Sequence, residues 1–390
     1  MSGAARPAEL FFEVGRSQLN KKNEELCGDS IAVAESPESM VIVCSDGLGS
    51  GVKANILSSL TAKMAATMLQ QGCSLDEVIE TLAHTLPVCE VRHLAYSTFG
   101  ILQIMRDGRT YLAEYDTPPT FYGRAGRLAG LPRTERTIGE RIIREAFFEL
   151  RPGDWVAMVS DGVLHAGIGG IWNLGWGADK VGRYLEMAAT KGDEATVIAT
   201  EITDLCSKLY NGEPGDDASV VIVKVRHPRD LVVLIGPPAD RRDDPEVVRR
   251  LMSAPGKRAV CGGTTGNLVA RELGRSIGVD LTSIDPKVPP TGIIDGIDLV
   301  SEGILTVSYA VEKLKSGVHL RDVAFRRDGA SRLTALLLEA DRVQIMVGRA
   351  MNPAHQSPGV PINLGLKNKV VEDLVRALAA RKKTVRVEYY

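Results

Sequence analysis

The chain has 390 residues, more than the usual single domain, and its length predicts two domains. Apolar residues make up 44% and charged residues 25%, and 47 basic against 49 acidic residues leave a net charge of −2. This balance argues against binding to nucleic acid or to a membrane surface. With no apolar run near the roughly 20 residues of a membrane span and no signal peptide, the expected location is the cytoplasm.

The first half of the chain is predicted to segregate strands and helices. Strands are expected at 10–14, 31–34 and 40–44, followed by helices at 52–70 and 74–85. A period of two over 97–105, 109–115 and 120–123 is typical of a meander of hairpins. Strands follow at 138–143, 146–150 and 155–160, then helices at 179–189 and 194–209 and a strand at 217–225. This order predicts an α+β fold in which helices pack outside a β-sandwich.

A proline and charged residues at 227–230 interrupt the strand pattern and place a domain boundary there, giving domains 1–227 and 228–390. The second domain is predicted to be smaller and of the α/β class, with strands at 231–236, 258–261, 342–347 and 384–389 separated by helices. One loop before a helix resembles a phosphate-binding turn but lacks the lysine of a P-loop. It is either a small-ligand site or a tight turn, and it consists of Gly262, Gly263, Thr264, Thr265, Gly266 and Asn267.

Acidic residues recur at the edges of predicted strands in the first half. Asp46 follows the apolar run 41–44 and begins a glycine-rich loop with Gly47. A single Asp-Gly pair is usually a turn, but chance turns poorly explain the recurrence of this pattern. The other acids in such positions are Asp29, Asp161 and Asp216.

If the fold brings these acids together, their charges repel unless cations neutralise them. The six cysteines are scattered and the histidines form no pair, so zinc and disulfides are not expected. Oxygen ligands point instead to hard ions such as Mg²⁺ or Mn²⁺. Two such ions about 3.5–4 Å apart can hydrolyse a phosphoester with a metal-activated water.

Residues 11–225 resemble the metal-dependent protein phosphatase (PPM) superfamily, and within it the branch of the sporulation stage II protein E phosphatases. DGLGSGVKA, which starts at Asp46, is similar to the DGMGSG-type signature of that branch, and SDGV at 160–163 and GDDAS at 215–219 match its later motifs. The resemblance implies two sheets flanked by helices, a centre of two Mn²⁺ or Mg²⁺ ions, and hydrolysis of phosphoserine or phosphothreonine on a protein substrate in bacterial signalling.

The same resemblance implies roles for individual residues. The metal ligands would be Asp29, Asp46, the carbonyl of Gly47, Asp161 and Asp216, with Asp46 and Asp161 as the catalytic pair. Asp217 stands where many relatives carry asparagine and is expected to hydrogen-bond beside the ligands or to be a ligand itself. Relatives also use an early arginine to bind phosphate, and Arg16 or Lys21 is the candidate here.

One hairpin departs from the family pattern. Bacterial relatives usually carry Ala-Gly-His-Pro-Pro-like residues there, whereas residues 114–119 of this chain read EYDTPP. The turn is kept and the histidine is not. The departure leaves the metal-binding acids in place and bears on the contacts with substrate.

Three interpretations follow from the sequence. The first is an active serine/threonine phosphatase with a C-terminal regulatory or ligand-binding domain, and the presence of all four acids favours it. The second is a catalytically silent signalling module that binds a partner through the same fold. In the third, the C-terminal domain is the active part, a nucleotide-binding enzyme, and the first domain is its regulator. The sequence leaves open whether the protein forms a homodimer.

Overall fold

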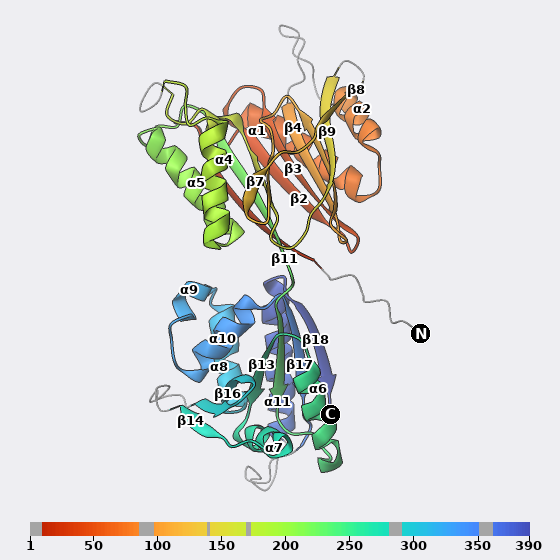
Figure 1. The fold of residues 1–390 in the computed structure, drawn as a ribbon, viewed down its shortest axis with the longest axis vertical. Helices are drawn as coiled ribbons and strands as arrows, with labels where there is room; N and C mark the ends of the chain where they lie inside the picture. The colour runs from red at the N-terminus through yellow and green to blue at the C-terminus, as the bar shows by residue number, and fades with distance from the viewer. Residues whose placement is uncertain (1–9, 86–96, 139–140, 169–172, 281–290, 351–361) are drawn as a thin grey trace. The chain divides into compact units, whose positions relative to one another are not determined.

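The computed structural model describes residues 10–85, 97–138, 141–168, 173–280, 291–350 and 362–390. Contacts divide the chain into two compact units, Met1–His227 and Pro228–Tyr390 (Figure 1). No helix among the described residues combines the length and the apolar character needed to cross a membrane.

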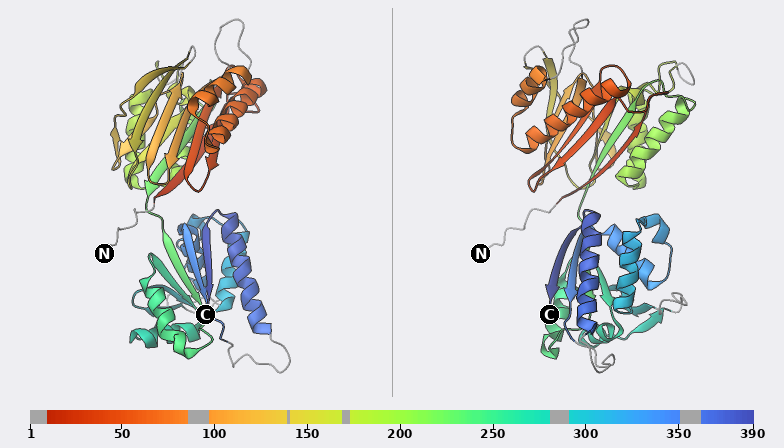
Figure 2. Two further views of the ribbon diagram at one scale, coloured as in Figure 1. Left: turned by 90° about the vertical axis from the view of Figure 1, so that its right-hand side faces the viewer. Right: turned by 180° about the vertical axis from the view of Figure 1, so that it is seen from behind.

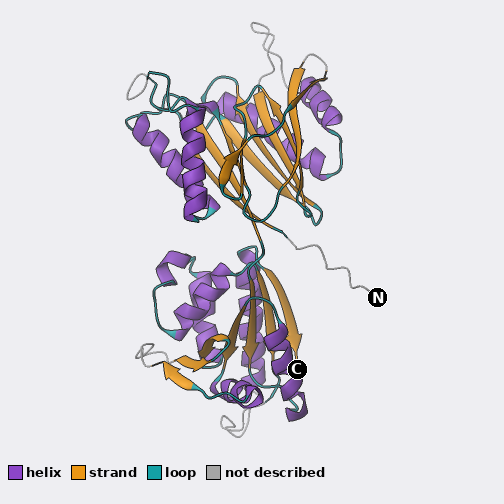
Figure 3. Ribbon diagram, in the orientation of Figure 1, coloured by secondary structure: helices purple, strands orange, loops and turns teal. Residues whose placement is uncertain are grey.

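The first unit alternates groups of strands with pairs of helices (Figure 3). Its strands are β1 (Phe11–Leu19), β2 (Asp29–Glu35), β3 (Ser39–Gly47), β4 (Ser97–Met105), β5 (Arg109–Tyr115), β6 (Phe121–Arg124), β7 (Arg127–Ala129), β8 (Thr134–Ile138), β9 (Arg141–Glu149), β10 (Trp155–Val159) and β11 (Ala218–Arg226). Its helices are α1 (Gly51–Gln70), α2 (Leu75–Thr85), α3 (Asp161–Leu164), α4 (Ala178–Lys191) and α5 (Ala195–Leu209).

The strands form two sheets, one in the order β1-β11-β10-β6-β7 and one in the order β2-β3-β4-β5-β9-β8. Alternation along each strand sends side chains to two different cores. In β4, Leu102 and Ile104 belong to the core shared by both sheets, whereas Phe99 and Ile101 pack with α1 and α2. Helices α4 and α5 cover the outer face of the other sheet (Figure 2). The predicted α+β sandwich flanked by helices is confirmed.

Strand pairing places the acidic motifs at strand ends. Asp29 begins β2 and lies opposite Asp46 near the end of β3. Asp161 follows β10, and Asp216 lies just before β11, which pairs with β10 up to Val159 opposite Val220. The two pairs of acids therefore come from different sheets of the sandwich.

The second unit contains an open, mostly parallel sheet with helices on both faces. Its elements are β12 (Asp230–Ile235), η1 (Arg241–Asp243), α6 (Asp244–Ser253), β13 (Lys257–Cys261), α7 (Gly263–Leu273), β14 (Gly278–Asp280), β15 (Thr291–Ile294), β16 (Ile297–Ser301), α8 (Ile304–Lys315), α9 (Leu320–Val323), α10 (Gly329–Glu339), β17 (Arg342–Val347), α11 (Ile362–Ala380) and β18 (Thr384–Tyr389). The sheet order is β14-β15-β16-β13-β12-β17-β18. Helices α6 and α7 pack on one face, and α8, α10 and α11 on the other, as in a doubly wound α/β fold.

Candidate metal centre

Asp29 and Asp46 form the part of the site that the β2–β3 ladder builds. The side chain of Asp29 is buried, and its Oδ2 has no hydrogen-bond partner. Burial, followed by the charge of Asp46, raises the pKa of Asp29 well above its ordinary value. Burial also raises the pKa of Asp46 to about 7, helped by the charges of Asp161 and Asp216. Both carboxylates are thus in a place where an added positive charge would stabilise them.

Asp161 and Asp216 bring the second sheet to the site. Asp161 is the first residue of α3 and its carboxylate is 43% exposed, with Oδ2 at 3.8 Å from Nδ1 of His165. Burial and then the charge of Asp161 raise the pKa of Asp216. A Cβ on Gly162 would lie 2.0 Å from the carbonyl oxygen of Asp217, so only glycine allows the α3 turn to pack this closely against the 216–217 loop. This packing keeps Asp161 beside Asp216.

Asp217 connects the loop before β11 to the loop after β1. Its carboxylate is buried, and Oδ1 accepts a hydrogen bond of 2.9 Å from the backbone N–H of Lys21. The backbone N–H of Asp217 donates to Oδ1 of Asp216 at 3.0 Å. A Cβ on Gly28 would lie 2.9 Å from Oδ2 of Asp217, which places this carboxylate against the residue that precedes Asp29.

The glycine-rich loop after Asp46 is held close to helix α1. A Cβ on Gly47 would lie 2.1 Å from the carbonyl oxygen of Ala54, so a side chain there would push α1 away from the end of β3. The N–H of Gly47 donates to the carbonyl of Gly28 at 3.2 Å. Ser50 fixes the far side of the loop, where its Oγ donates to Oε1 of Glu24 at 2.9 Å.

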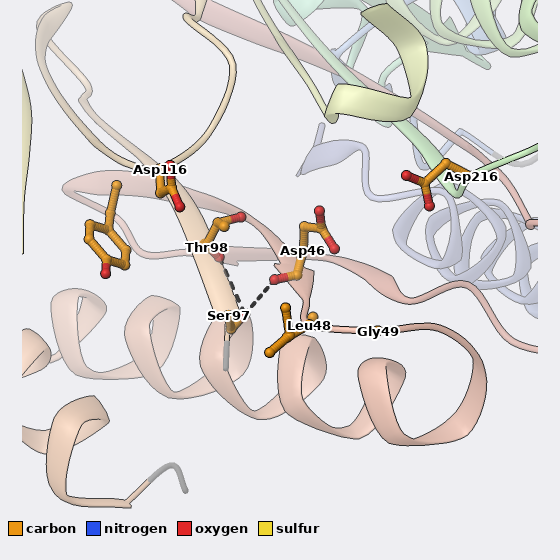
Figure 4. Close-up of a pocket in the computed structure, with 9 residues that line it drawn as sticks. Asp46, Leu48, Gly49, Ser97, Thr98, Asp116 and Asp216 are labelled. Carbon is orange, nitrogen blue, oxygen red and sulfur yellow. Dashed lines mark hydrogen bonds between the residues drawn. The ribbon is translucent and has the colours of Figure 1, made fainter. Parts of the chain in front are cut away.

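A cavity of about 220 Å³ opens beside these acids (Figure 4). Ser97 Oγ donates to the backbone carbonyl of Asp46 at 2.9 Å and so ties β4 to the acid. Two lining residues, Ser97 and Thr98, were missed by sequence reasoning, whereas Tyr115 and Asp116 belong to the segment 114–119 that departs from the family pattern. Asp116 has a φ of 47°, uncommon outside glycine, and it lies in the EYDTPP segment whose departure from the family pattern was its sequence signal. The cavity is lined by Asp46, Gly47, Leu48, Gly49, Ser97, Thr98, Tyr115, Asp116 and Asp216.

The remaining sequence candidates fall in three places. The charge of Lys21 acts to lower the pKa of Asp216, which places Lys21 near the acids. Arg16 is exposed on β1 opposite Val221, three pairs before the strand ends at Leu19 opposite Ala218. The glycine-rich loop of residues 262–267 belongs to the second unit, where its residues from Gly263 onward form the first turn of α7.

The donor set fits hard divalent cations. In the side-chain positions described, no group of three or more acidic, histidine or cysteine residues converges tightly enough to hold an ion. Carboxylates without cations repel one another, so the acids here need a neutralising charge. All the candidate donors are oxygens, however, and the buried Asp29 Oδ2 lacks any partner. Oxygen-only donors with several carboxylates are what Mg²⁺ and Mn²⁺ prefer.

Comparison with solved structures gives several similar folds. The phosphatase domain of SpoIIE from Bacillus subtilis with a fragment of its regulatory domain is 23% identical, with a TM-score of 0.47 over 56% of this chain and 64% of that one. The PP2C domain of SiaA from Pseudomonas aeruginosa is 18% identical, with a TM-score of 0.44 over 54% and 84% of the two chains. RsbX in complex with magnesium is 17% identical, with a TM-score of 0.40 over 57% and 98%.

The family comparison concerns the first unit. This chain spans about 64% of the SpoIIE structure named above. No curated protein matches this chain. The family model of stage II sporulation protein E (SpoIIE) matches residues 36–226. This range contains β3 with Asp46 as well as the later Asp161 and Asp216 motifs. The model of the stage II sporulation protein E family thus matches most of the first unit, and this is the branch that the sequence motifs resemble.

Proposed function

We propose that the first unit is a metal-dependent phosphatase that hydrolyses phosphoserine and phosphothreonine on a protein substrate, in bacterial signalling in the cytoplasm. The observation that carries the proposal is the meeting of acids from both sheets, where the charges of Asp161 and Asp216 help to raise the pKa of Asp46. These acids stand beside a cavity of about 220 Å³. Pockets for drug-sized ligands are larger, about 300–1,000 Å³, so this cavity suits one phosphorylated side chain.

The residues of the site divide into ligands and supports. Asp29, Asp46, Asp161, Asp216 and the carbonyl of Gly47 would hold two Mn²⁺ or Mg²⁺ ions. When bound, such ions supply a water of lowered pKa and stabilise the negative charge that develops on the phosphoryl group.

The other residues act by orienting these ligands. Ser97 holds the backbone of Asp46 through its hydrogen bond, and Asp217 holds the loops that carry Asp216 and Lys21. Lys21 is the better placed of the two candidates for binding the phosphate, because its charge reaches Asp216. Asp46 and Asp216 line the cavity and so stand where the phosphoryl group would enter.

Phosphate release from a phosphoserine peptide tests this function. The full chain should release phosphate with Mn²⁺ and lose the activity in EDTA, and Asp46→Asn and Asp161→Asn should each lower kcat/KM more than about 100-fold. Asp204→Asn, an exposed change on α5, is the matched control and should retain activity. Metal-independent release, or full activity in both variants, would overturn the proposal. A folded chain that binds Mn²⁺ without releasing phosphate would support the silent binding module.

We also propose a regulatory or ligand-binding role for the second unit, with residues 262–267 as its loop. The support is positional, because the loop follows β13 at the carboxyl end of a parallel sheet, where open α/β sheets bind ligands. Gly262 has a φ of 128°, which favours glycine. ADP should raise the melting temperature of the full chain, and Gly262→Ala should remove that shift. No shift with ADP or with inorganic phosphate would contradict a phosphate-binding loop.

A further inference from the structure

Asp116 presents a carboxylate at the wall of the cavity that the proposed function does not use. It follows β5 directly and lines the cavity together with Asp46 and Asp216. In the view of Figure 4, Asp116 and Asp216 lie on either side of Asp46. With a φ of 47°, Asp116 adopts a left-handed conformation, which persists only where the surrounding structure holds it.

A buried ion pair holds the loop that contains Asp116. The Glu114 carboxylate is fully buried and accepts two hydrogen bonds from Arg133, Nε to Oε2 at 2.7 Å and Nη2 to Oε1 at 3.1 Å. The backbone N–H of Thr120 donates to the same carboxylate at 2.6 Å, and Arg133 Nη2 donates to the carbonyl of Thr120 at 2.7 Å. Residues 114 and 120 are thus fastened together across the loop.

Arg144 fastens the middle of the same loop. Its Nη2 donates to the carbonyl of Thr117 at 2.6 Å, and its Nε lies 3.7 Å from Oε2 of Glu114. The loop is therefore held at both ends and at the residue after Asp116. A carboxylate on such a support is presented at a fixed position, which is what a specificity contact requires.

The charge of Asp116 has no partner within the described part of the chain. Glu114 accepts hydrogen bonds from Arg133 and lies near Arg144, and no ion pair joins Asp116 to a described lysine, arginine or histidine. Two divalent ions would balance the four carboxylates proposed as their ligands. Asp116 would then leave a negative charge beside the path of the incoming substrate.

We infer that Asp116 is a specificity-determining residue that selects phosphorylated segments with a lysine or arginine next to the phosphorylated residue. This inference rests on the proposed phosphatase function. A basic neighbour of the phosphorylated residue is attracted to Asp116, and an acidic neighbour is repelled by it. Water and salt screen the interaction between Asp116 and the neighbouring side chain of the substrate. The preference is therefore expected to be modest, about 10-fold in kcat/KM.

The test compares two phosphoserine peptides that differ only in a lysine or a glutamate beside the phosphoserine. The full chain with Mn²⁺ should prefer the lysine peptide about 10-fold, and the preference should shrink as salt is added. Asp116→Asn should bring the ratio close to one, because asparagine also tolerates the left-handed conformation and removes only the charge. Asp116→Lys should reverse the preference.

Asp107→Asn is the matched control, because Asp107 precedes the opposite end of β5 and pairs with Arg109. It should keep the native ratio. An Asp116→Asn ratio equal to the native one, with both peptides still hydrolysed, would overturn the inference alone. A variant that changes only the Mn²⁺ concentration dependence would assign Asp116 to a cation and also overturn it. Failure of the native chain to release phosphate from either peptide would overturn the phosphatase function itself.

Discussion

At the scale of single residues, the ionised acids of the candidate metal centre destabilise the folded state when no metal is bound. Asp29, Asp46 and Asp216 all have a raised pKa, with burial as the largest cause and neighbouring aspartates next. A raised pKa means that the folded state binds protons more tightly than the unfolded state does. The stability that these groups contribute is therefore present at low pH and is lost as the pH rises through the folded pKa.

Unfolding measurements in EDTA test whether stability falls as the pH rises. Relative to Asp46→Asn, the native chain should lose stability as the pH rises from about 4 to about 7, the range between the ordinary and the raised pKa of Asp46. The difference in the free energy of unfolding should reach roughly 2 kcal/mol, discounted for the partial exposure of the site. Urea titrations of both proteins over this pH range measure it. A difference that stays flat, or that favours the native chain at higher pH, would contradict the raised pKa.

The candidate ligands could be predicted from sequence because each acid adjoins an apolar run that reads as a buried strand. Asp46 and Asp161 carry the clearest signal, since each ends such a run and is followed by glycine. Ser97 and Thr98 carry no such signal, because only the pairing of β4 with β3 brings them beside Asp46. Asp116 depends on a left-handed turn and on a distant arginine, and neither is visible in the local sequence.

At the scale of elements, the β5–β6 connection depends on the Glu114–Arg133 pair. The Glu114 side chain is fully buried and that of Arg133 is 21% exposed. Removing one partner of a buried pair leaves an uncompensated charge, which is strongly destabilising. Arg133→Met should therefore lower the free energy of unfolding by about 3 kcal/mol, measured by urea denaturation.

Arg109→Met is the control for that change. Arg109 pairs with Asp107 on the surface, with side chains 77% and 48% exposed, and exposed pairs contribute little. Its free energy of unfolding should stay close to that of the native chain. Equal effects of the two substitutions would contradict the structural role of the buried pair.

The helices and hairpins of the first unit were largely predictable because their periods are clear. The predicted helix at 52–70 corresponds to α1 (Gly51–Gln70), and the strands at 97–105 and 109–115 correspond to β4 and β5. The predicted end of the first strand at residue 14 was wrong, since β1 continues to Leu19. The polar residues at the end of β1 resembled a loop. They belong to the strand because Ser17 hydrogen-bonds to Thr203 and Gln18 donates a hydrogen bond to Ser219, both on distant elements.

One further element was misjudged for a related reason. The strand predicted at 138–143 includes the end of β8 and the start of β9, and its residues 139–140 lie outside the described residues. The strand predicted at 146–150 falls within β9 up to Glu149, and β9 runs unbroken from Arg141 to Glu149. Its polar centre resembled a break, yet Glu145 is paired there with Arg136 at 2.9 Å.

At the scale of the whole molecule, each unit has its own hydrophobic core. Among the described residues, the first unit has three clusters, one between its sheets and one under each helical layer. The described residues of the second unit form two clusters, one on each face of its sheet. The α/β class of the second unit could be predicted from alternating strands and helices, but its strand order could not, because strands from distant parts of the chain pair in it.

The most direct test of the metal-centre proposal is calorimetric titration of Mn²⁺ into the metal-free full chain at about pH 8, above the raised pKa of Asp46. The proposal predicts two ions bound per chain, weaker binding at lower pH because protons then compete for the carboxylates, and loss of at least one ion in Asp46→Asn. Asp204→Asn should bind as the native chain does. Absence of Mn²⁺ binding by the folded chain, or binding that Asp46→Asn leaves unchanged, would contradict the proposal.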